Sequence, residues 1–296
     1  MAKPSSSSVP MTAQRIARGK YLFEVVADCD GCHSERDFSR FAGPLIAGRR
    51  GKGFAFPAEL GLPGNVVAPN LTPDRETGLG AWTDGDKIRA IRDGVSRDGR
   101  ALFPVMGYPR FRHMSDEDVE ALVAFMNTLA PVRNPLPTTS LMFPVSLLVK
   151  SDPRPAGNVA APDRSDKLRY GQYLANLAGC QECHTRAERG RPVGQPFAGG
   201  EEFRFSESLM AVSANISPDP ETGIGRWSER RFLDTFYQYK PYLAEGSPKS
   251  GPERFTVMPW LGFAQMEPED LKAIYTYLMT QPPVNNKVET RPGYGR

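Results

Sequence analysis

All four cysteines of the 296-residue chain occur in two copies of one five-residue motif. Cys-Asp-Gly-Cys-His spans residues 29–33, and Cys-Gln-Glu-Cys-His spans residues 180–184. Because every cysteine belongs to a motif, none is left to form the structural disulfides of a small secreted fold. The chain must therefore fold so that it builds two similar sites, one around each motif.

Cys-x-x-Cys-His is the attachment motif of c-type haem. Thiols at this spacing form thioether bonds to the two vinyl groups of the porphyrin, and the adjacent histidine supplies a proximal nitrogen to the iron. The sequence therefore predicts two covalently bound haem c groups. The expected attachment residues are Cys29, Cys32, Cys180 and Cys183, and the expected proximal ligands are His33 and His184.

Two other uses of paired cysteines fit the pattern less well. The cysteines could form a Cys₄ zinc site, but zinc ribbons separate their cysteine pairs by tens of residues at most, and about 150 residues separate these pairs. A zinc site would also leave both adjacent histidines unexplained. A thioredoxin-like redox pair requires a βαβ context, which the sequence pattern does not provide.

An internal repeat carries the two motifs. Residues 19–33 (GKYLFEVVADCDGCH) match residues 171–184 (GQYLANLAGCQECH), and residues 68–82 (APNLTPDRETGLGAW) match residues 213–227 (SANISPDPETGIGRW). A third match joins residues 114–132 to residues 266–284. Because the offset between copies varies, two duplicated domains with loops of different length are favoured over a solenoid. We predict domains at residues 12–132 and 165–284, joined by a semi-rigid, Pro-rich linker at residues 133–164.

Each repeat is expected to begin and end with a helix. Apolar residues recur at helical spacing in residues 12–28, which lead directly into the first motif. In residues 115–129, Ser115 is a favourable N-cap and Asp118 lies three residues later. Pro268 suits the first turn of the matching helix in the second copy. Strand patterns are weak and the intervening segments are rich in Gly and Pro, so the sequence predicts an all-α fold with long loops.

The repeat also restricts the second axial ligand of each iron. A haem iron with one histidine ligand needs another strong ligand or keeps an open position. The third histidine, His113, has Gln265 as its counterpart, so a ligand used by both copies cannot be histidine. We therefore expect His113 to be a surface or capping residue.

Two pairs of methionines recur at equivalent positions of the repeat. Met114 and Met266 lie just before helix starts, where packing as a hydrophobic staple is sufficient to explain them. Met106 and Met258 lie in loop segments that nearby prolines stiffen. A thioether held in a rigid loop is suited to axial ligation, although core packing is the commoner role of methionine. We predict that Met106 and Met258 are the axial ligands.

The repeated segment Asn-x-x-Pro-Asp…Thr-Gly-x-Gly-x-Trp has two interpretations. Its Pro-Asp dipeptides and glycines are typical of tight turns. Alternatively, its amide and indole donors could hydrogen-bond a haem propionate at the edge of the site. The residues that would make these contacts are Asn70, Trp82, Asn215 and Trp227.

Composition and charge exclude several other classes of protein. The formal net charge is only +3, and no segment carries the concentrated basic charge of a nucleic-acid-binding protein. The apolar stretch at residues 138–149 is too short for a membrane span and contains Pro144. Residues 1–11 lack the apolar region of a secretory signal. Because haem c is attached outside the cytoplasm, we expect a periplasmic protein whose export signal has been removed or replaced.

These motifs resemble the c-type cytochrome subunits of bacterial periplasmic dehydrogenases, which accept electrons from alcohol, aldehyde and sugar-acid dehydrogenases. The resemblance rests on both haem motifs, on residues 68–82 and 213–227 and on the segment VMPW, and it covers both repeats. It implies two tandem class I cytochrome c domains, in which the first and last helices cross where a small residue meets an aromatic one. The matching pairs are Gly19 with Phe125 and Gly171 with Tyr277.

The resemblance implies an electron carrier without catalytic residues, with a dehydrogenase as donor and a cytochrome or oxidase as acceptor. Many such subunits have three haem domains and a membrane anchor. This sequence has two motifs and no anchor pattern, so any membrane association is expected to occur through a complex. The alternative is a di-haem enzyme, related to peroxidases or thiosulfate dehydrogenases, with one haem accessible to substrate. The matching methionines argue against the first of these enzymes, and the lack of a spare cysteine argues against the second.

Overall fold

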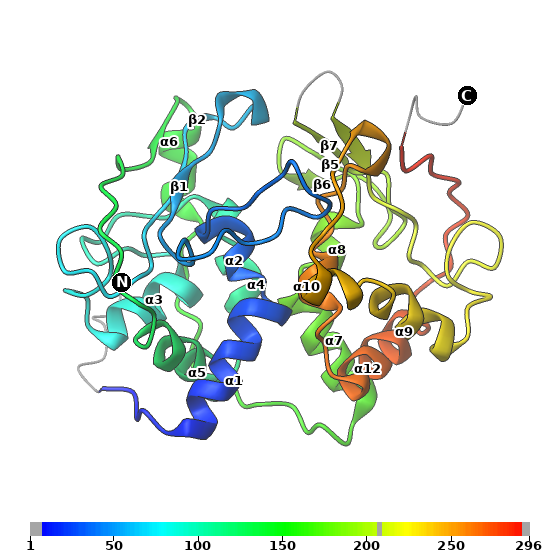
Figure 1. Ribbon diagram of the computed structural model, residues 1–296, viewed down its shortest axis with the longest axis horizontal. Helices are drawn as coiled ribbons and strands as arrows, with labels where there is room; N and C mark the ends of the chain where they lie inside the picture. The colour runs from blue at the N-terminus through cyan, green and yellow to red at the C-terminus, as the bar shows by residue number, and fades with distance from the viewer. Residues whose placement is uncertain (1–7, 206–208, 292–296) are drawn as a thin grey trace. The chain divides into compact units, whose positions relative to one another are not determined.

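The computed structural model describes residues 8–205 and 209–291, and its chain divides into two compact units. The first unit contains residues up to Arg36 and Leu45–Ala161, and the second contains Asp37–Pro44 together with the chain from Pro162 onward. Both units consist mainly of helices and long loops (Figure 1).

The first cysteine motif lies in the second helix of the first unit. Helix α1 (Ala13–Tyr21) continues as a π-helical turn at Leu22–Val26 and leads into α2 (Cys29–His33). The others are α3 (Asp84–Asp93), α4 (Tyr108–Phe111), α5 (Asp116–Met126) and α6 (Val145–Leu148). Ser115 Oγ accepts a hydrogen bond from the Asp118 amide at 3.2 Å, which confirms Ser115 as the N-cap of α5.

The second unit repeats the helices α1 to α5 in the same order and adds α10. Its helices are α7 (Lys167–Leu177), α8 (Cys180–Cys183), α9 (Glu229–Tyr237), α10 (Pro241–Glu245), α11 (Trp260–Phe263) and α12 (Pro268–Leu278). The predicted closing helix therefore begins at Pro268, where the fixed backbone angle of proline suits the first helical position.

In both units the first helix packs closely at a glycine against the helix that closes the repeat, which is α5 in the first unit and α12 in the second. A β-carbon at Gly19 in α1 would lie 1.8 Å from the carbonyl oxygen of Ala121 and 2.9 Å from Cβ of Phe125, both in α5. At Gly171 in α7 the nearest atom would be the carbonyl oxygen of Ala273 in α12, at 1.9 Å. The two backbones can approach this closely because glycine has no side chain. Figure 1 shows α1 beside α5 and α7 beside α12.

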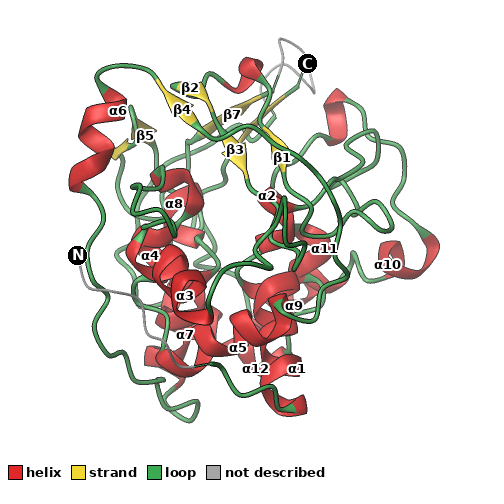
Figure 2. Ribbon diagram, turned by 90° about the vertical axis from the view of Figure 1, so that its left-hand side faces the viewer, coloured by secondary structure: helices red, strands yellow, loops and turns green. Residues whose placement is uncertain are grey.

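Short strands add to the helices in the described residues. β1 (Phe54–Ala55) pairs with β3 (Val67–Ala68), and β2 (Gly64–Asn65) pairs with β4 (Ser140–Leu141). In the second unit, β5 (Ala187–Glu188) pairs with β6 (Arg191–Pro192), and β7 (Glu202–Arg204) pairs with β8 (Met210–Val212). The fold is mostly helical but not purely α, as Figure 2 shows. Pairs of two or three residues are too short to leave an alternating pattern in the sequence, so the all-α expectation omitted them.

Residues 133–161, within the segment expected to be a linker, are grouped with the first unit. Asn134 Nδ2 donates to the Lys52 carbonyl oxygen at 2.8 Å, and the amide of Ala156 donates to Asp93 Oδ1 at 2.9 Å. Strand β4 also belongs to this segment. These contacts hold the Pro-rich chain against the unit along much of its length.

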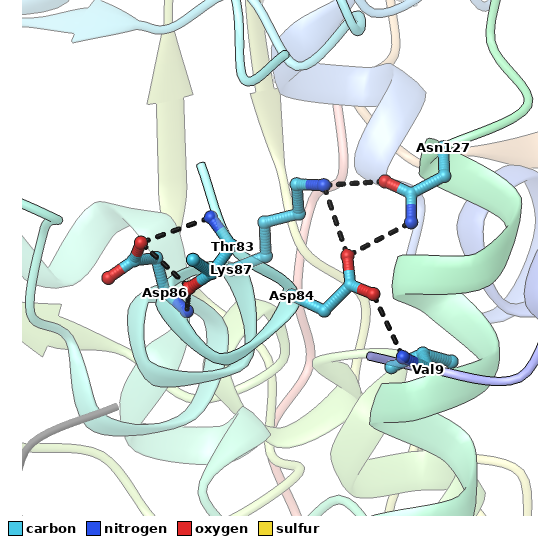
Figure 3. Close-up of polar contacts among 6 residues, drawn as sticks. All are labelled: Val9, Thr83, Asp84, Asp86, Lys87 and Asn127. Carbon is cyan, nitrogen blue, oxygen red and sulfur yellow. Dashed lines mark hydrogen bonds and ion pairs between the residues drawn. The ribbon is translucent and has the colours of Figure 1, made fainter. Parts of the chain in front are cut away.

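A buried polar cluster fixes α3 relative to the end of α5 (Figure 3). The Lys87 ammonium contacts Asp84 Oδ1 and Asn127 Oδ1, and Asn127 Nδ2 donates to Asp84 Oδ1 at 3.0 Å. Asp84 Oδ2 also accepts from the amide of Val9 at 2.9 Å. The N-terminal segment, α3 and α5 are therefore joined through one carboxylate, and α3 forms one wall of the first site.

Candidate haem sites

The first motif is itself a short helix, and its geometry follows from the residue before it. Asp28 has the left-handed angle φ = 45°, which turns the chain from the π-helical segment into α2. Residues three and four apart lie on one face of a helix, so α2 presents Cys29, Cys32 and His33 in the same direction. The spacing within the motif therefore aims both thiols and the imidazole at one side.

One backbone carbonyl orients the histidine of each motif. His33 Nδ1 lies 2.9 Å from the carbonyl oxygen of Pro69, and His184 Nδ1 lies 2.7 Å from that of Ala214. A proton on Nδ1 satisfies this contact and leaves the Nε2 lone pair free to bind a metal. Burial lowers the pKa of both histidines, which favours the neutral, metal-binding form.

The carbonyl groups of Pro69 and Ala214 belong to the repeated loop segments 68–82 and 213–227. The sequence pattern did not predict this role. The histidine and its carbonyl partner are 36 residues apart in the first unit and 30 in the second, so their spacing gave no signal. Pro69 and Ala214 do occupy equivalent positions of the repeated loop. The two histidines therefore have equivalent partners in the two units.

A cavity in the first unit brings together most of the residues predicted for the first site. Cys29, Cys32, His33, Trp82 and Met106 all line it. Apolar side chains from several elements form most of the remaining wall, among them Val67, Leu71, Leu79, Ile91, Phe103, Leu122 and Met126. A site of this kind suits a large, flat, apolar group held by a few specific polar contacts.

Met106 reaches the cavity from a tight turn. The residues Pro104–Met106 form a single 3₁₀ turn, and Gly107 follows with φ = 77°. Glycine adopts this left-handed angle without strain, so Gly107 ends the 3₁₀ turn. The turn holds Met106 at the edge of the cavity with its side chain partly exposed.

Met258 lies in the corresponding loop of the second unit, where hydrogen bonds fix its backbone. Its amide donates to Thr256 Oγ1 at 3.1 Å, and its carbonyl oxygen accepts from the amide of Trp260 at 2.8 Å.

The motif helix α8 begins after Gly179, whose φ of 70° repeats the left-handed geometry of Asp28. The second unit thus shares the local geometry of the first on the proximal side.

The other methionines and the third histidine have different surroundings. Met114 and Met266 are 0% and 3% exposed, so both are packed in the cores of their units. This burial agrees with the packing role expected from their positions before helix starts. His113 is exposed at the surface, also as expected.

Asn70 and Asn215 make hydrogen bonds within the loops that carry them. The Asn70 amide nitrogen donates to the Val132 carbonyl oxygen at 2.7 Å, and its Oδ1 accepts from the amide of Thr72 at 3.0 Å. Asn215 makes the equivalent bonds to Val284 at 2.7 Å and Ser217 at 2.9 Å. Both side chains therefore tie a loop to the segment that follows α5 in the first unit and α12 in the second.

The two tryptophans differ in their surroundings. Trp82 lines the first cavity, whereas Asn70 is not among the residues that line it. In the second unit, the guanidinium of Arg231 lies 4.5 Å from the ring centroid of Trp227. The backbone carbonyl of Trp227 also accepts a hydrogen bond from the Tyr275 hydroxyl at 2.7 Å. The predicted contacts of the two asparagines and the two tryptophans with a haem propionate stay a prediction.

Carboxylates lie within and beside the first motif, and the sequence pattern did not indicate a role for them. Arg50 bridges Glu24 and Asp30, and Asp30 accepts a hydrogen bond from Ser34 Oγ at 2.6 Å. Burial raises the pKa of Asp28 to about 6, against the opposing attraction of Arg36. In the second motif the positions of Asp28 and Asp30 hold Gly179 and Gln181, so the first site alone has these two acidic groups.

The chemistry of these residues fits haem c. Each unit offers a cysteine pair at the thioether spacing and an imidazole whose Nδ1 is already engaged by a carbonyl. In the first unit a thioether sulfur and an apolar wall share the same cavity. Among the described residues, no helix has the length and apolar character that a membrane crossing requires.

Comparison with known proteins identifies relatives of this chain. Residues 16–130 match the family model for cytochrome c. The chain is 32% identical over 294 residues to the fructose dehydrogenase cytochrome subunit of Gluconobacter japonicus, a match that covers 95% of this chain and 56% of that protein. It is 31% identical over 236 residues to the gluconate 2-dehydrogenase cytochrome c subunit of Pantoea cypripedii, covering 74% and 50%.

A third relative bears on the number of haems. The diheme cytochrome c-type protein of Cereibacter sphaeroides is 30% identical over 175 residues, which are 57% of this chain and 56% of that protein. The chain thus spans about half the length of the relatives that it matches. Residues 16–130 are a cytochrome c domain, and the chain is a relative of the cytochrome c subunits of dehydrogenases.

Proposed function

We propose that this protein is a periplasmic di-haem cytochrome c that passes electrons from a dehydrogenase to a cytochrome or oxidase. The observation that carries the proposal is the first cavity, because two attachment cysteines, a carbonyl-oriented histidine and a loop methionine all line it. The repeat extends the same assignment to the second unit. The named relatives support electron transfer within a dehydrogenase complex.

In this proposal, Cys29, Cys32, Cys180 and Cys183 attach the two haems, and the irons are held by His33 with Met106 and by His184 with Met258. Haem, when bound, supplies a reversible one-electron couple at each site. A thioether ligand raises the reduction potential of that couple relative to a second histidine. With both axial positions filled by the chain, neither site has an open position for a substrate.

Counting the haems tests the first part of the proposal. A pyridine haemochrome assay on protein exported to the periplasm should give two haems c per chain. Protein expressed without export should contain none, because the thioether bonds are formed outside the cytoplasm. One haem per exported chain would contradict the di-haem assignment.

Replacing the methionines tests the ligands. Met106→Ala and Met258→Ala should each lower the potential of one haem and allow carbon monoxide to bind that reduced iron. Met114→Leu and Met266→Leu are the matched controls, because these side chains are buried in the core and should leave both haem spectra unchanged. Rapid, stoichiometric binding of carbon monoxide to the unaltered protein would instead favour a di-haem enzyme.

A further inference from the structure

The second unit includes a short segment that follows the first motif in sequence, Asp37–Pro44. Within it, Phe41 is 6% exposed and its ring lies 5.2 Å from that of Tyr239, in a stacked arrangement with an interplanar angle of 25°. Tyr242 meets the Phe41 ring edge-on at 5.8 Å. Phe41, Ala42 and Leu261 form a small apolar core, and we call this group with Tyr239, Tyr242 and Trp260 the Phe41 cluster.

Backbone hydrogen bonds hold the segment in this position. The amide of Phe41 donates to the Pro248 carbonyl oxygen at 2.8 Å, and the amide of Ser250 donates to the Ser39 carbonyl oxygen at 2.7 Å. Arg40 Nη1 adds a bond to the carbonyl oxygen of Ser247 at 2.9 Å. Backbone hydrogen bonds and ring contacts therefore both fix the position of Phe41.

The Phe41 cluster is connected directly to the backbone of Met258. The ring of Tyr239 lies 4.9 Å from that of Trp260. The Trp260 indole nitrogen donates to Thr256 Oγ1 at 3.2 Å, and the same oxygen accepts the Met258 amide. Because the Trp260 amide also donates to the Met258 carbonyl oxygen, both polar groups of the Met258 backbone depend on the position of Trp260 or its partner.

The first unit holds its methionine loop in another way. Tyr108, the counterpart of Trp260 in the repeat, is fully buried and packs where Gly94 leaves room for its ring. Met106 bonds through its amide to the Phe103 carbonyl oxygen at 3.1 Å. All these residues belong to the first unit, whereas the Phe41 cluster belongs to the second. The first site therefore serves as an internal control.

We propose that Phe41 is a positioning residue for Met258 as the axial ligand of the second haem. This inference rests on the proposed function, since it requires Met258 to bind the iron. A thioether is a neutral ligand whose bond to iron depends on the loop that presents it, so a loosened loop favours the dissociated state. Phe41 acts by packing Tyr239 and Trp260 so that the hydrogen bonds around Met258 stay formed.

The test compares Phe41→Ala with the unaltered holoprotein. We expect weaker absorbance in the red band that reports a methionine–iron bond in ferric haem, by an amount that corresponds to one haem. We also expect exogenous imidazole to bind the second haem about tenfold more tightly, the equivalent of about 1.4 kcal/mol. The spectrum and potential of the first haem should not change.

Two further variants separate positioning from general loss of structure. Phe41→Leu keeps much of the apolar volume and should restore most of the methionine band. Ser39→Ala changes an exposed side chain of the same segment, keeps its backbone bonds and should behave as the unaltered protein. Circular dichroism and the first-haem potential report whether each variant is folded.

The outcomes distinguish this inference from the proposed function. If Met258→Ala leaves the second haem unchanged, the ligand assignment itself is wrong. If Met258→Ala opens the second iron but a folded Phe41→Ala keeps its full methionine band and its imidazole affinity, Phe41 has no positioning role. Equal effects of Phe41→Ala on both haems would likewise overturn the proposal.

Discussion

Hydrogen bonds to the repeated loops fix the orientation of the histidine in each motif. The carbonyl groups of Pro69 and Ala214 orient the two histidines. Asn70 and Asn215 tie the same loops to the segments that follow α5 and α12. Buried side chains of this kind cost free energy when they lose a partner. The orientation of each histidine therefore depends on the hydrogen bonds that its asparagine makes to hold the loop in place.

The half-buried carboxyl of Asp28 gives a prediction on how stability depends on pH. Its pKa is raised from 3.8 to about 6, mainly by burial, so the folded state retains a proton that the unfolded state has lost. Its contribution to stability therefore falls as the pH rises through this interval and is constant above it. Asp28→Asn removes this loss, and asparagine tolerates the left-handed angle at this position.

We expect Asp28→Asn to raise the free energy of unfolding of the holoprotein by about 1 to 2 kcal/mol above pH 6. Below about pH 4, where both states of the unaltered protein are protonated, the two proteins should have similar stability. Urea unfolding across this range measures the difference. A gain that is the same at every pH would show that the charge of Asp28 is not its cause.

Among the elements, the crossings of α1 with α5 and of α7 with α12 frame each unit. Gly19 and Gly171 lie at the contact in both. A salt bridge adds to the first crossing, because Arg18 binds both carboxylate oxygens of Asp118 at 2.8 Å. The repeat therefore preserves the backbone contact, while the polar interactions around it vary.

Gly19→Ala tests the importance of this crossing. The added carbon would lie 1.8 Å from a backbone oxygen, so the helices must separate. We expect a loss of about 3 kcal/mol or more in the free energy of unfolding, the upper part of the range for overpacked contacts. Lys20→Ala, at an exposed position on the same helix, should change stability by less than about 0.5 kcal/mol. If the two variants unfold at similar temperatures, close packing at Gly19 is not important for stability.

Helix positions were predictable from sequence to a greater extent than loop structure. The apolar spacing and the N-cap at Ser115 indicated α5, whereas nothing local indicated the π-helical turn at Leu22–Val26 or the short strand pairs. Helix signals repeat over several turns of one segment. The strands have only two or three residues each, which carry too little pattern to reveal them.

In the molecule as a whole, each compact unit contains one cysteine motif and one methionine loop. The proximal and distal residues predicted for each haem therefore lie in the same unit. The segment Asp37–Pro44 is the exception to a division by sequence, because it is grouped with the second unit. The packing of Phe41 explains this grouping, since its aromatic partners are Tyr239 and Tyr242.

The division into units predicts how the protein behaves when one haem is removed. In Cys180→Ser/Cys183→Ser the second attachment is lost, and exported protein should contain one haem c per chain. The potential and methionine band of the remaining haem should match those of the first haem in the unaltered protein, because its ligands and cavity belong to the first unit. A variant that retains no haem at all would show that the first site cannot form without the second.

The sequence by itself determined the two Cys-x-x-Cys-His motifs and the internal repeat, and it led to the two methionines among ten that we propose as ligands. These features are local or depend on comparing one half of the chain with the other. Only the tertiary structure decided that Met106 shares a cavity with His33, which carbonyl groups orient the histidines, and that Phe41 packs in the second unit. Such contacts join residues far apart in the chain, and their geometry exists only once the loops have closed around a common core.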